Sequence, residues 1–258
     1  MAAGPRPLDR RTNELSRVRI DLLLVDRGLA PSRERARALL LAGQVRVGGH
    51  SVSKAGTLVD AAAEIELATP DHPYVGRGGL KLAHALDAFG IAVEGREALD
   101  IGASTGGFTD VLLQRGARRV VALDVGHGQL DWSLRNDARV VVIEHFNARR
   151  LTLADLPGAV DVVVVDVSFI SLRHILPVIP PVVRSGADIV VLVKPQFEAG
   201  RADAPKGVVR DPSVHDRVVR DIVAAATEVG LAHVAATPSP ITGQEGNVEF
   251  LLHLRPAA

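Results

Sequence analysis

One stretch of twelve residues, L-D-I-G-A-S-T-G-G-F-T-D at 99–110, constrains the fold of this chain more than any other. Apolar residues lead into Asp100, glycines follow, and an apolar pattern of helical spacing begins at Phe108. A strand, a glycine turn and a helix in this order form the ligand-binding half of a Rossmann-like unit. Asp124 ends the next apolar run 22 residues after Gly102, a spacing at which a carboxylate reaches a ribose. The stretch therefore predicts an α/β domain that binds a nucleoside-containing cofactor.

The turn departs from the dinucleotide-binding pattern G-x-G-x-x-G. Asp100 stands two residues before it, where a negative charge would face the middle of the ligand and disfavour a pyrophosphate. S-adenosylmethionine has no phosphate and carries an ammonium and a sulfonium, which an acid favours. We therefore expect this methyl donor, with NAD or an ordinary strand-to-helix loop as the alternatives. The expected cofactor-binding residues are Asp100, Gly102, Ser104, Thr105, Gly106, Gly107, Phe108, Asp124, Val125 and Asp166.

Strand and helix patterns alternate through the rest of the larger part of the chain. After a helix over 80–89, strands are expected near 97–101, 119–124, 140–143, 161–166 and 188–194. Helices are expected near 107–115, 171–180 and 213–229. The strands are nearly continuous in valine, leucine and isoleucine, as in a parallel sheet covered on both faces. Two last strands, near 232–237 and 247–254, flank a Pro/Gly-rich turn, which predicts that the final strand is antiparallel.

The beginning of the chain is basic. Residues 1–58 carry eleven Arg and Lys against five Asp and Glu, although the whole chain has 30 of each. A basic module joined to a larger domain suggests a polyanion-binding unit; a solvated arginine face is the alternative. The expected division is a mobile arm over 1–16, a small α+β domain over 17–68, a Pro/Gly-rich linker over 69–79 and the α/β domain over 80–258.

Within the small domain, a helix over 20–27 is expected to stop at Gly28 and a second, capped by Ser32, at Gly43. Strands are expected at Val45–Val47, Ser51–Val52 and Ile65–Leu67.

Composition excludes several functions. The chain has no cysteine, so it forms neither a disulfide nor a thiolate metal site, and it has no cysteine nucleophile. The first residues lack an apolar signal core, and no apolar run approaches ~18 residues. We therefore expect a cytoplasmic protein without a membrane span. His127 and His145 have no partner at metal-ligand spacing, so no metal is expected, and Trp132 is expected at the adenine pocket or at the core edge.

Charged residues stand where strands of the sheet end. Asp166 closes the strand D-V-V-V-V-D, Lys194 closes D-I-V-V-L-V-K, and Glu249 lies at the start of the last strand. Because ligands bind at the carboxyl ends of parallel strands, these three should share one crevice, whereas the pattern does not place Lys81. Lysines beside acids suit methylation of a hydroxyl, which is a poor nucleophile until its proton leaves. Surface charges are the alternative interpretation of each.

Two resemblances follow from longer motifs. Two short helices followed by G-Q-V-R-V-G-G resemble the alpha-L RNA-binding fold. The segments V-G-R-G-G-L-K-L, D-I-G-A-S-T-G-G-F-T, D-V-G-H-G-Q-L, D-V-S-F-I-S-L, V-K-P-Q-F-E and G-N-V-E-F resemble the TlyA family, which joins that fold to an FtsJ-like methyltransferase. Many FtsJ-like enzymes have Ala-Pro where this chain has Ser104-Thr105, although Ser-Thr is similar to TlyA itself.

The resemblance implies a mechanism and a substrate. It implies that Lys81, Asp166, Lys194 and Glu249 form a catalytic tetrad, with Lys194 as the base toward a ribose 2′-hydroxyl of a cytidine in ribosomal RNA. The chain ends at Ala258, without the extension typical of members that modify both subunits, so the large subunit is expected. A non-catalytic ribosome-binding or assembly factor and a hemolysin-like membrane-active protein remain alternatives.

The expected RNA contacts lie in both domains. Phosphate contacts of the small domain would give affinity and orientation without reading sequence, and a basic loop over 199–212 is expected to close over the RNA. The candidate residues are Arg17, Arg19, Arg33, Arg37 and Arg46 in the small domain and Lys206 and Arg210 in the loop.

Overall fold

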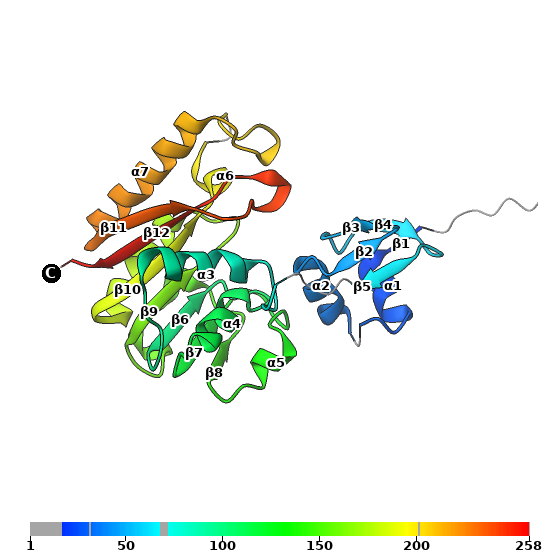
Figure 1. Ribbon diagram of the computed structural model, residues 1–258, viewed down its shortest axis with the longest axis horizontal. Coiled ribbons are helices and arrows are strands. Elements are labelled where there is room, and N and C mark those ends of the chain that lie inside the picture. The colour runs from blue at the N-terminus through cyan, green and yellow to red at the C-terminus, as the bar shows by residue number, and fades with distance from the viewer. Residues whose placement is uncertain (1–16, 31, 68–71, 201, 258) are drawn as a thin grey trace, which may run out of the picture. The chain divides into compact units, whose positions relative to one another are not determined.

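A computed structural model describes residues 17–30, 32–67, 72–200 and 202–257. The chain divides into two compact units, Met1–Thr69 and Pro70–Ala258, each with its own core (Figure 1). The arm expected over 1–16 lies outside the described residues, as do residues 68–71 of the expected linker.

The first unit is a small α+β domain. Its elements are β1 (Arg17–Arg19), α1 (Ile20–Asp26), α2 (Arg33–Leu41), β2 (Val45–Val47), β3 (His50–Ser51), β4 (Leu58–Asp60) and β5 (Ile65–Leu67). The side chain of Ser32 accepts a hydrogen bond from Arg35 N at 3.2 Å and so caps α2 as expected. Strands β3, β2 and β5 form an antiparallel sheet, while the pairing of β1 with β4 was not expected. Buried Ile20, Leu24 and Leu40 hold the helices against the sheets.

The second unit is built on a seven-stranded sheet in the order β11-β12-β10-β9-β6-β7-β8. Its strands are β6 (Glu97–Ile101), β7 (Arg119–Leu123), β8 (Val140–Ile143), β9 (Val160–Val165), β10 (Val183–Val193), β11 (Leu231–Pro238) and β12 (Phe250–Pro256). β12 is antiparallel to both of its neighbours, and β6 to β10 pair in parallel. The expected fold class, a mostly parallel Rossmann-like sheet whose last strand is antiparallel, is confirmed.

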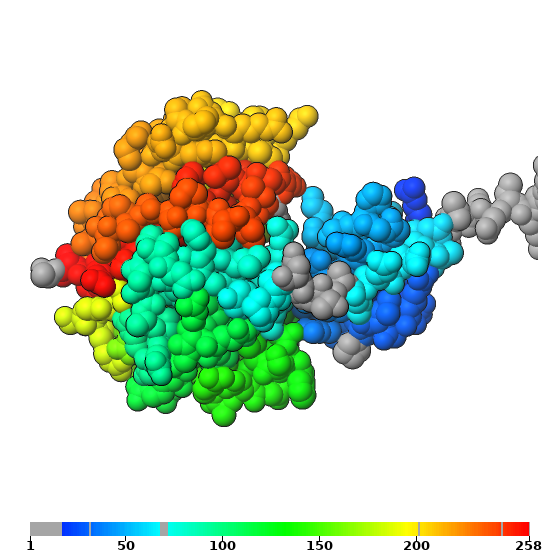
Figure 2. Space-filling model, in the orientation of Figure 1, coloured from blue at the N-terminus to red at the C-terminus, as the bar shows by residue number. Residues whose placement is uncertain are grey.

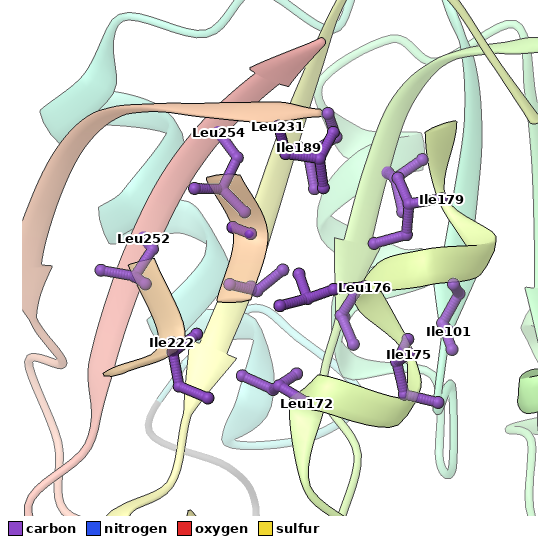
Figure 3. Close-up of a cluster of buried hydrophobic side chains, with 14 of the residues drawn as sticks. Ile101, Leu172, Ile175, Leu176, Ile179, Ile189, Ile222, Leu231, Leu252 and Leu254 are labelled. Atoms are coloured by element: carbon purple, nitrogen blue, oxygen red, sulfur yellow. The ribbon is translucent and has the colours of Figure 1, made fainter. Parts of the chain in front are cut away.

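Both faces of the sheet are covered, and each face has its own core. Successive strand residues point to opposite sides, so neighbouring residues enter different cores. Val163 and Val165 pack in one core and Val162 and Val164 in the other. The first core lies under α7 (Pro212–Glu228) and is drawn in Figure 3. The second lies under α3 (Gly78–Phe89) and α4 (Gly107–Gln114), and residues of α3 form part of the surface in the space-filling view (Figure 2).

One expected helix does not form. Residues 171–180 make short 3-10 turns at Leu172–His174, Leu176–Val178 and Pro180–Val182 instead of a continuous helix. The prolines of this segment lack the N–H that an α-helix needs in its interior. Two four-residue helices were also not expected, namely α5 (Trp132–Arg135) and α6 (Pro195–Glu198).

Residues expected in the linker pack on the second unit. Val75 N donates to Asp110 Oδ2 at 2.9 Å, and Gln114 Nε2 donates to the carbonyl of Pro73 at 3.1 Å. α3 begins at Gly78, two residues earlier than the pattern suggested. The described part of 69–79 is therefore held to α4.

A buried ion cluster fastens the sheet near the amino end of β6. Asp188 is 5% exposed and accepts hydrogen bonds from Arg96 Nη1 at 2.7 Å and Arg255 Nε at 2.9 Å. The Nε2 of His253, whose ring stacks on Phe89, lies 2.8 Å from the same carboxylate. These partners hold the pKa of Asp188 below its usual range against the opposing effect of burial.

We expect Asp188→Ala to lower the free energy of unfolding by about 3 kcal/mol, because it leaves Arg96, Arg255 and the buried His253 without their shared partner. The matched control is Asp221→Ala, whose exposed pair with Arg173 spans 3.8 Å and should contribute less than ~0.5 kcal/mol. Urea unfolding followed by circular dichroism measures both. Equal effects of the two substitutions would contradict the account of the cluster.

Candidate active site at the carboxyl ends of the strands

Three strand ends bring acids and a lysine to one edge of the sheet. Asp166 follows β9 directly, and its N–H donates to the carbonyl of Ile101 at the end of β6 (3.0 Å). Lys194 follows β10, whose last residue pairs with Phe250, the first residue of antiparallel β12. Glu249 precedes Phe250, so Lys194 and Glu249 flank that pair on the same side, although Glu249 lies one residue before the strand rather than in it.

The four candidate catalytic residues form two ion pairs. Lys194 Nζ lies 2.5 Å from Asp166 Oδ1, and it donates a hydrogen bond to Ser168 Oγ at 2.9 Å. Lys81, on the first turn of α3, pairs with Glu249 Oε2. The side chains of Lys81 and Glu249 are 10% and 2% exposed, those of Lys194 and Asp166 11% and 22%. The structure thus places Lys81, which the sequence pattern left unplaced, at the same edge.

Glu249 is held from its other side by the loop before β12. A Cβ atom at Gly243 would overlap the carboxylate of Glu249, so only glycine leaves the acid room. Asn247, 3% exposed, accepts from Val209 N at 3.1 Å and donates to the carbonyl of Gly207 at 3.0 Å. Asn247 therefore ties the basic loop over 199–212 to the segment that carries Glu249.

The glycine turn fits closely between two strand ends. Gly102 has φ +90°, and a Cβ there would overlap the carbonyl oxygen of Asp166. The N–H groups of Gly102 and Ala103 both donate to the carbonyl of Leu123, at 2.8 and 3.1 Å. The turn then enters α4 through Gly106, which is the N-cap at φ +97°. Phe108, also expected to bind the cofactor, is 3% exposed and packs in the core.

Asp124 is fixed beside this turn by two backbone donors. Its Oδ2 accepts from Ser104 N at 2.8 Å, and its Oδ1 accepts from Gly126 N at 2.7 Å. Ser104 has φ +48°, a conformation that costs free energy for a residue other than glycine and is often found at functional sites. Val125, the residue after Asp124, is 73% exposed.

A cavity of about 250 Å³ lies where β8 ends, lined by His145, Phe146, Asn147, Arg150 and Asp155.

Asp100 is buried and only half satisfied. It is 0% exposed; its Oδ2 accepts from Thr109 Oγ1 at 2.7 Å, and its Oδ1 has no hydrogen-bond partner. Burial, with smaller contributions from the charges of Asp166 and Asp124, raises the pKa of Asp100 to about 7. A buried carboxylate oxygen without a donor is rare and suits a cationic ligand.

The remaining candidates lie in the glycine turn, in the basic loop and in the first unit. Thr105 accepts a hydrogen bond from Asp131 N through its carbonyl (3.1 Å). Lys206 and Arg210 are exposed in the basic loop. Arg17, Arg19, Arg33, Arg37 and Arg46 all belong to the first unit.

The histidines near the turn do not form a metal centre. His127 stacks on His145 with centroids 4.6 Å apart, and His127 Nδ1 lies 2.9 Å from Glu144. Among the residues that the structure describes, no three His, Asp or Glu side chains are grouped as metal ligands. Trp132 is 72% exposed and so does not anchor the core edge.

Ser168, Thr109 and Phe169 were not among the expected site residues. Ser168 and Thr109 each bond to a charged group of the site, an interaction that a sequence pattern cannot show. Phe169 is 88% exposed at φ +64°, and its ring packs against Phe197 with centroids 5.1 Å apart. An exposed aromatic side chain in strained backbone, next to a residue that contacts Lys194, is a candidate for a ligand contact.

Known proteins resemble both units. An FtsJ-like methyltransferase model matches residues 74–256 and an S4 domain model matches residues 18–65. A relative from Mycobacterium tuberculosis, named 16S/23S rRNA (cytidine-2′-O)-methyltransferase TlyA, is 52% identical over 93% of this chain and 90% of its own length. Hemolysin A of Brachyspira hyodysenteriae is 42% identical over 92% of this chain and 99% of its own. A solved structure from Streptococcus thermophilus, described as a hemolysin, has a TM-score of 0.74 at 43% identity and covers 94% of this chain and 90% of that one.

No helix within the described ranges combines the length and apolar character needed to cross a membrane.

Replacing Asp100 should change how stability depends on pH. A folded-state pKa of about 7 lies above the unfolded value, so this group stabilises the fold below pH ~4 and that contribution is lost as pH rises through 7. Asp100→Asn lacks this loss, so its unfolding free energy relative to wild type should rise by on the order of 2 kcal/mol between pH 5 and 8. Urea unfolding at both pH values measures it, with Asp26→Asn as a charge-matched surface control. A difference independent of pH would contradict this account of Asp100.

Proposed function

The chain belongs to the TlyA family, an S4 domain followed by an FtsJ-like methyltransferase domain, and we propose that it methylates a cytidine ribose 2′-hydroxyl in ribosomal RNA with S-adenosylmethionine. The observation that carries the proposal is the pairing of Lys194 with Asp166 at the edge of the sheet where the glycine turn follows the neighbouring strand β6. This pairing supports Lys194 as a nitrogen base beside a site suited to a cationic methyl donor. Such a reaction takes place where ribosomal subunits are, in the cytoplasm.

The residues of the turn fit S-adenosylmethionine. The buried Asp100 Oδ1 without a donor suits the ammonium of the methionine part, and Asp124, fixed by two backbone N–H groups, suits the ribose hydroxyls. The cavity beside Phe146, whose other lining residues are polar or charged, would take the adenine. The bound cofactor supplies a methyl group on a positively charged sulfur.

Lys194 would activate the substrate hydroxyl. An alcohol attacks only as its proton leaves, and Lys194 would accept that proton as the neutral amine, after its ammonium has released a proton to solvent. Asp166 and Ser168 hold the resulting ammonium, since both already contact Nζ. Glu249 fixes Lys81 at the same edge, where its ammonium can contact the ribose or the neighbouring phosphate.

The RNA must reach this edge with its target nucleotide unstacked, because sequence-specific recognition of RNA uses splayed bases on aromatic side chains. Phe169, open to solvent and one residue after Ser168, would supply that surface. The S4 domain would supply phosphate contacts, and the basic loop with Lys206 and Arg210 remains a candidate for a second set.

Lys194→Met should lower the rate of methyl transfer by about 10³-fold or more, because it removes the proton acceptor and leaves the cofactor turn in place. The measurement is transfer of labelled methyl from S-adenosylmethionine to unmodified large and small ribosomal subunits, assayed separately; label on the large subunit is expected. Cofactor and subunit affinities of the same variant serve as controls. Wild-type protein that binds both but transfers nothing would instead indicate a non-catalytic ribosome factor.

Phe169→Ala should lower kcat/KM for the subunit by about 5- to 100-fold, the range that loss of one base–aromatic stack implies. Phe169→Tyr keeps the ring and should stay within about twofold of wild type. Cofactor affinity should be unchanged in both variants, since Phe169 lies outside the turn. Full activity of Phe169→Ala would show that the ring does not meet the target base.

A further inference from the structure

A single buried carboxylate in the S4 domain gathers three of its arginines. Asp21, the second residue of α1, is 0% exposed, although no apolar pattern requires an acid there. Its partners come from β1 and α2, which are Arg19, Arg33 and Arg37. These are three of the five arginines that the sequence suggested as RNA contacts.

All three arginines direct their Nε at the carboxylate of Asp21. Arg19 is bidentate, with Nε 2.9 Å from Oδ1 and Nη2 3.0 Å from Oδ2. Arg33 donates its Nε to Oδ2 at 2.9 Å, and Arg37 directs its Nε at the same oxygen from 3.7 Å. Arg33 and Arg37 thus contact the acid through Nε, the inner nitrogen of the guanidinium group. Their outer nitrogens, Nη1 and Nη2, are not needed for this contact.

Exposure separates the acid from its partners. The arginine side chains are 40%, 43% and 48% exposed, against 0% for Asp21. One bidentate arginine already satisfies a carboxylate, so two further cations on the same acid exceed what its burial requires. The cluster carries a net charge of +2 and presents it outward.

We propose that Asp21 is a positioning residue that holds Arg19, Arg33 and Arg37 as one preorganised clamp for the phosphates of RNA. Without the acid, three neighbouring guanidinium groups repel one another, and each regains rotamer freedom that it must give up again on binding. With it, their outer N–H groups stay aligned toward the phosphate oxygens. This inference rests on the proposed function, because it takes ribosomal RNA as the ligand.

Asp21→Asn separates preorganisation from net charge. The substitution makes the domain more positive, so charge alone predicts tighter RNA binding, whereas loss of the clamp predicts weaker binding. Asp26→Asn is the matched control, because it removes the same charge from an exposed residue at the end of the same helix. The full-length chain is titrated with unmodified large ribosomal subunits at several salt concentrations.

We expect Asp21→Asn to bind about 10-fold or more weakly, with a salt slope reduced by about 1 to 2. Its KM for the subunit should rise while kcat stays within about twofold, and Asp26→Asn should match or slightly exceed wild-type affinity. Binding by Asp21→Asn as tight as by Asp26→Asn would overturn the proposal. If the wild type neither binds nor methylates the subunit, the proposed function fails first, so the two failures are distinguishable.

A variant that keeps Asp21 guards against misfolding. Arg33→Lys preserves the charge but loses the Nε donor to Oδ2, so it should weaken binding several-fold with an unchanged melting curve. Cofactor affinity of Asp21→Asn reports whether the second unit is intact. Weak RNA binding by Asp21→Asn together with wild-type affinity of Arg33→Lys would mean that Asp21 acts only on folding, and would also overturn the proposal.

Discussion

Charges placed at the edge of a buried sheet must be paired, and this constraint shapes the catalytic unit. Lys194 and Asp166 close neighbouring parallel strands, and Lys81 and Glu249 join them from α3 and from the chain just before β12. Desolvation makes such pairs expensive, and apolar residues would often be at least as stable. Their presence at the edge where ligands of α/β sheets bind is therefore best understood through chemistry rather than stability.

Asp100 is the exception that completes the site. Every other acid at this edge meets a cation or backbone donors, whereas Asp100 keeps one buried oxygen without a donor and has its pKa raised to about 7. In the S4 domain, Asp21 shows the opposite arrangement, a buried acid with three arginines whose pKa is held well below its usual range. In the proposed function, Asp100 binds a cationic group of the cofactor. Asp21 instead orients three arginine side chains toward the RNA.

Sequence patterns predicted much of this arrangement because they record periodicity and strand ends. The valine-rich strands, the glycine turn and the positions of Asp166 and Lys194 all followed from such patterns, while the pairing of Lys81 with Glu249 depends on packing between α3 and the segment before β12. The helix predicted over 171–180 was wrong, because the prediction followed the apolar spacing and gave too little weight to the prolines of this segment. Ser168 was missed because loop conformation, not spacing, brings it to Lys194, and Phe169 because a sequence pattern does not show its exposure or its positive φ.

The most direct test of the account is to identify the methylated atom. Ribosomal RNA treated with the wild-type chain and S-adenosylmethionine would be digested to nucleosides and analysed by mass spectrometry. The account predicts 2′-O-methylcytidine as the new nucleoside, because the proposed base Lys194 suits a hydroxyl and the chain has no cysteine for attack on a base carbon. A methyl group on a base nitrogen or carbon would contradict it.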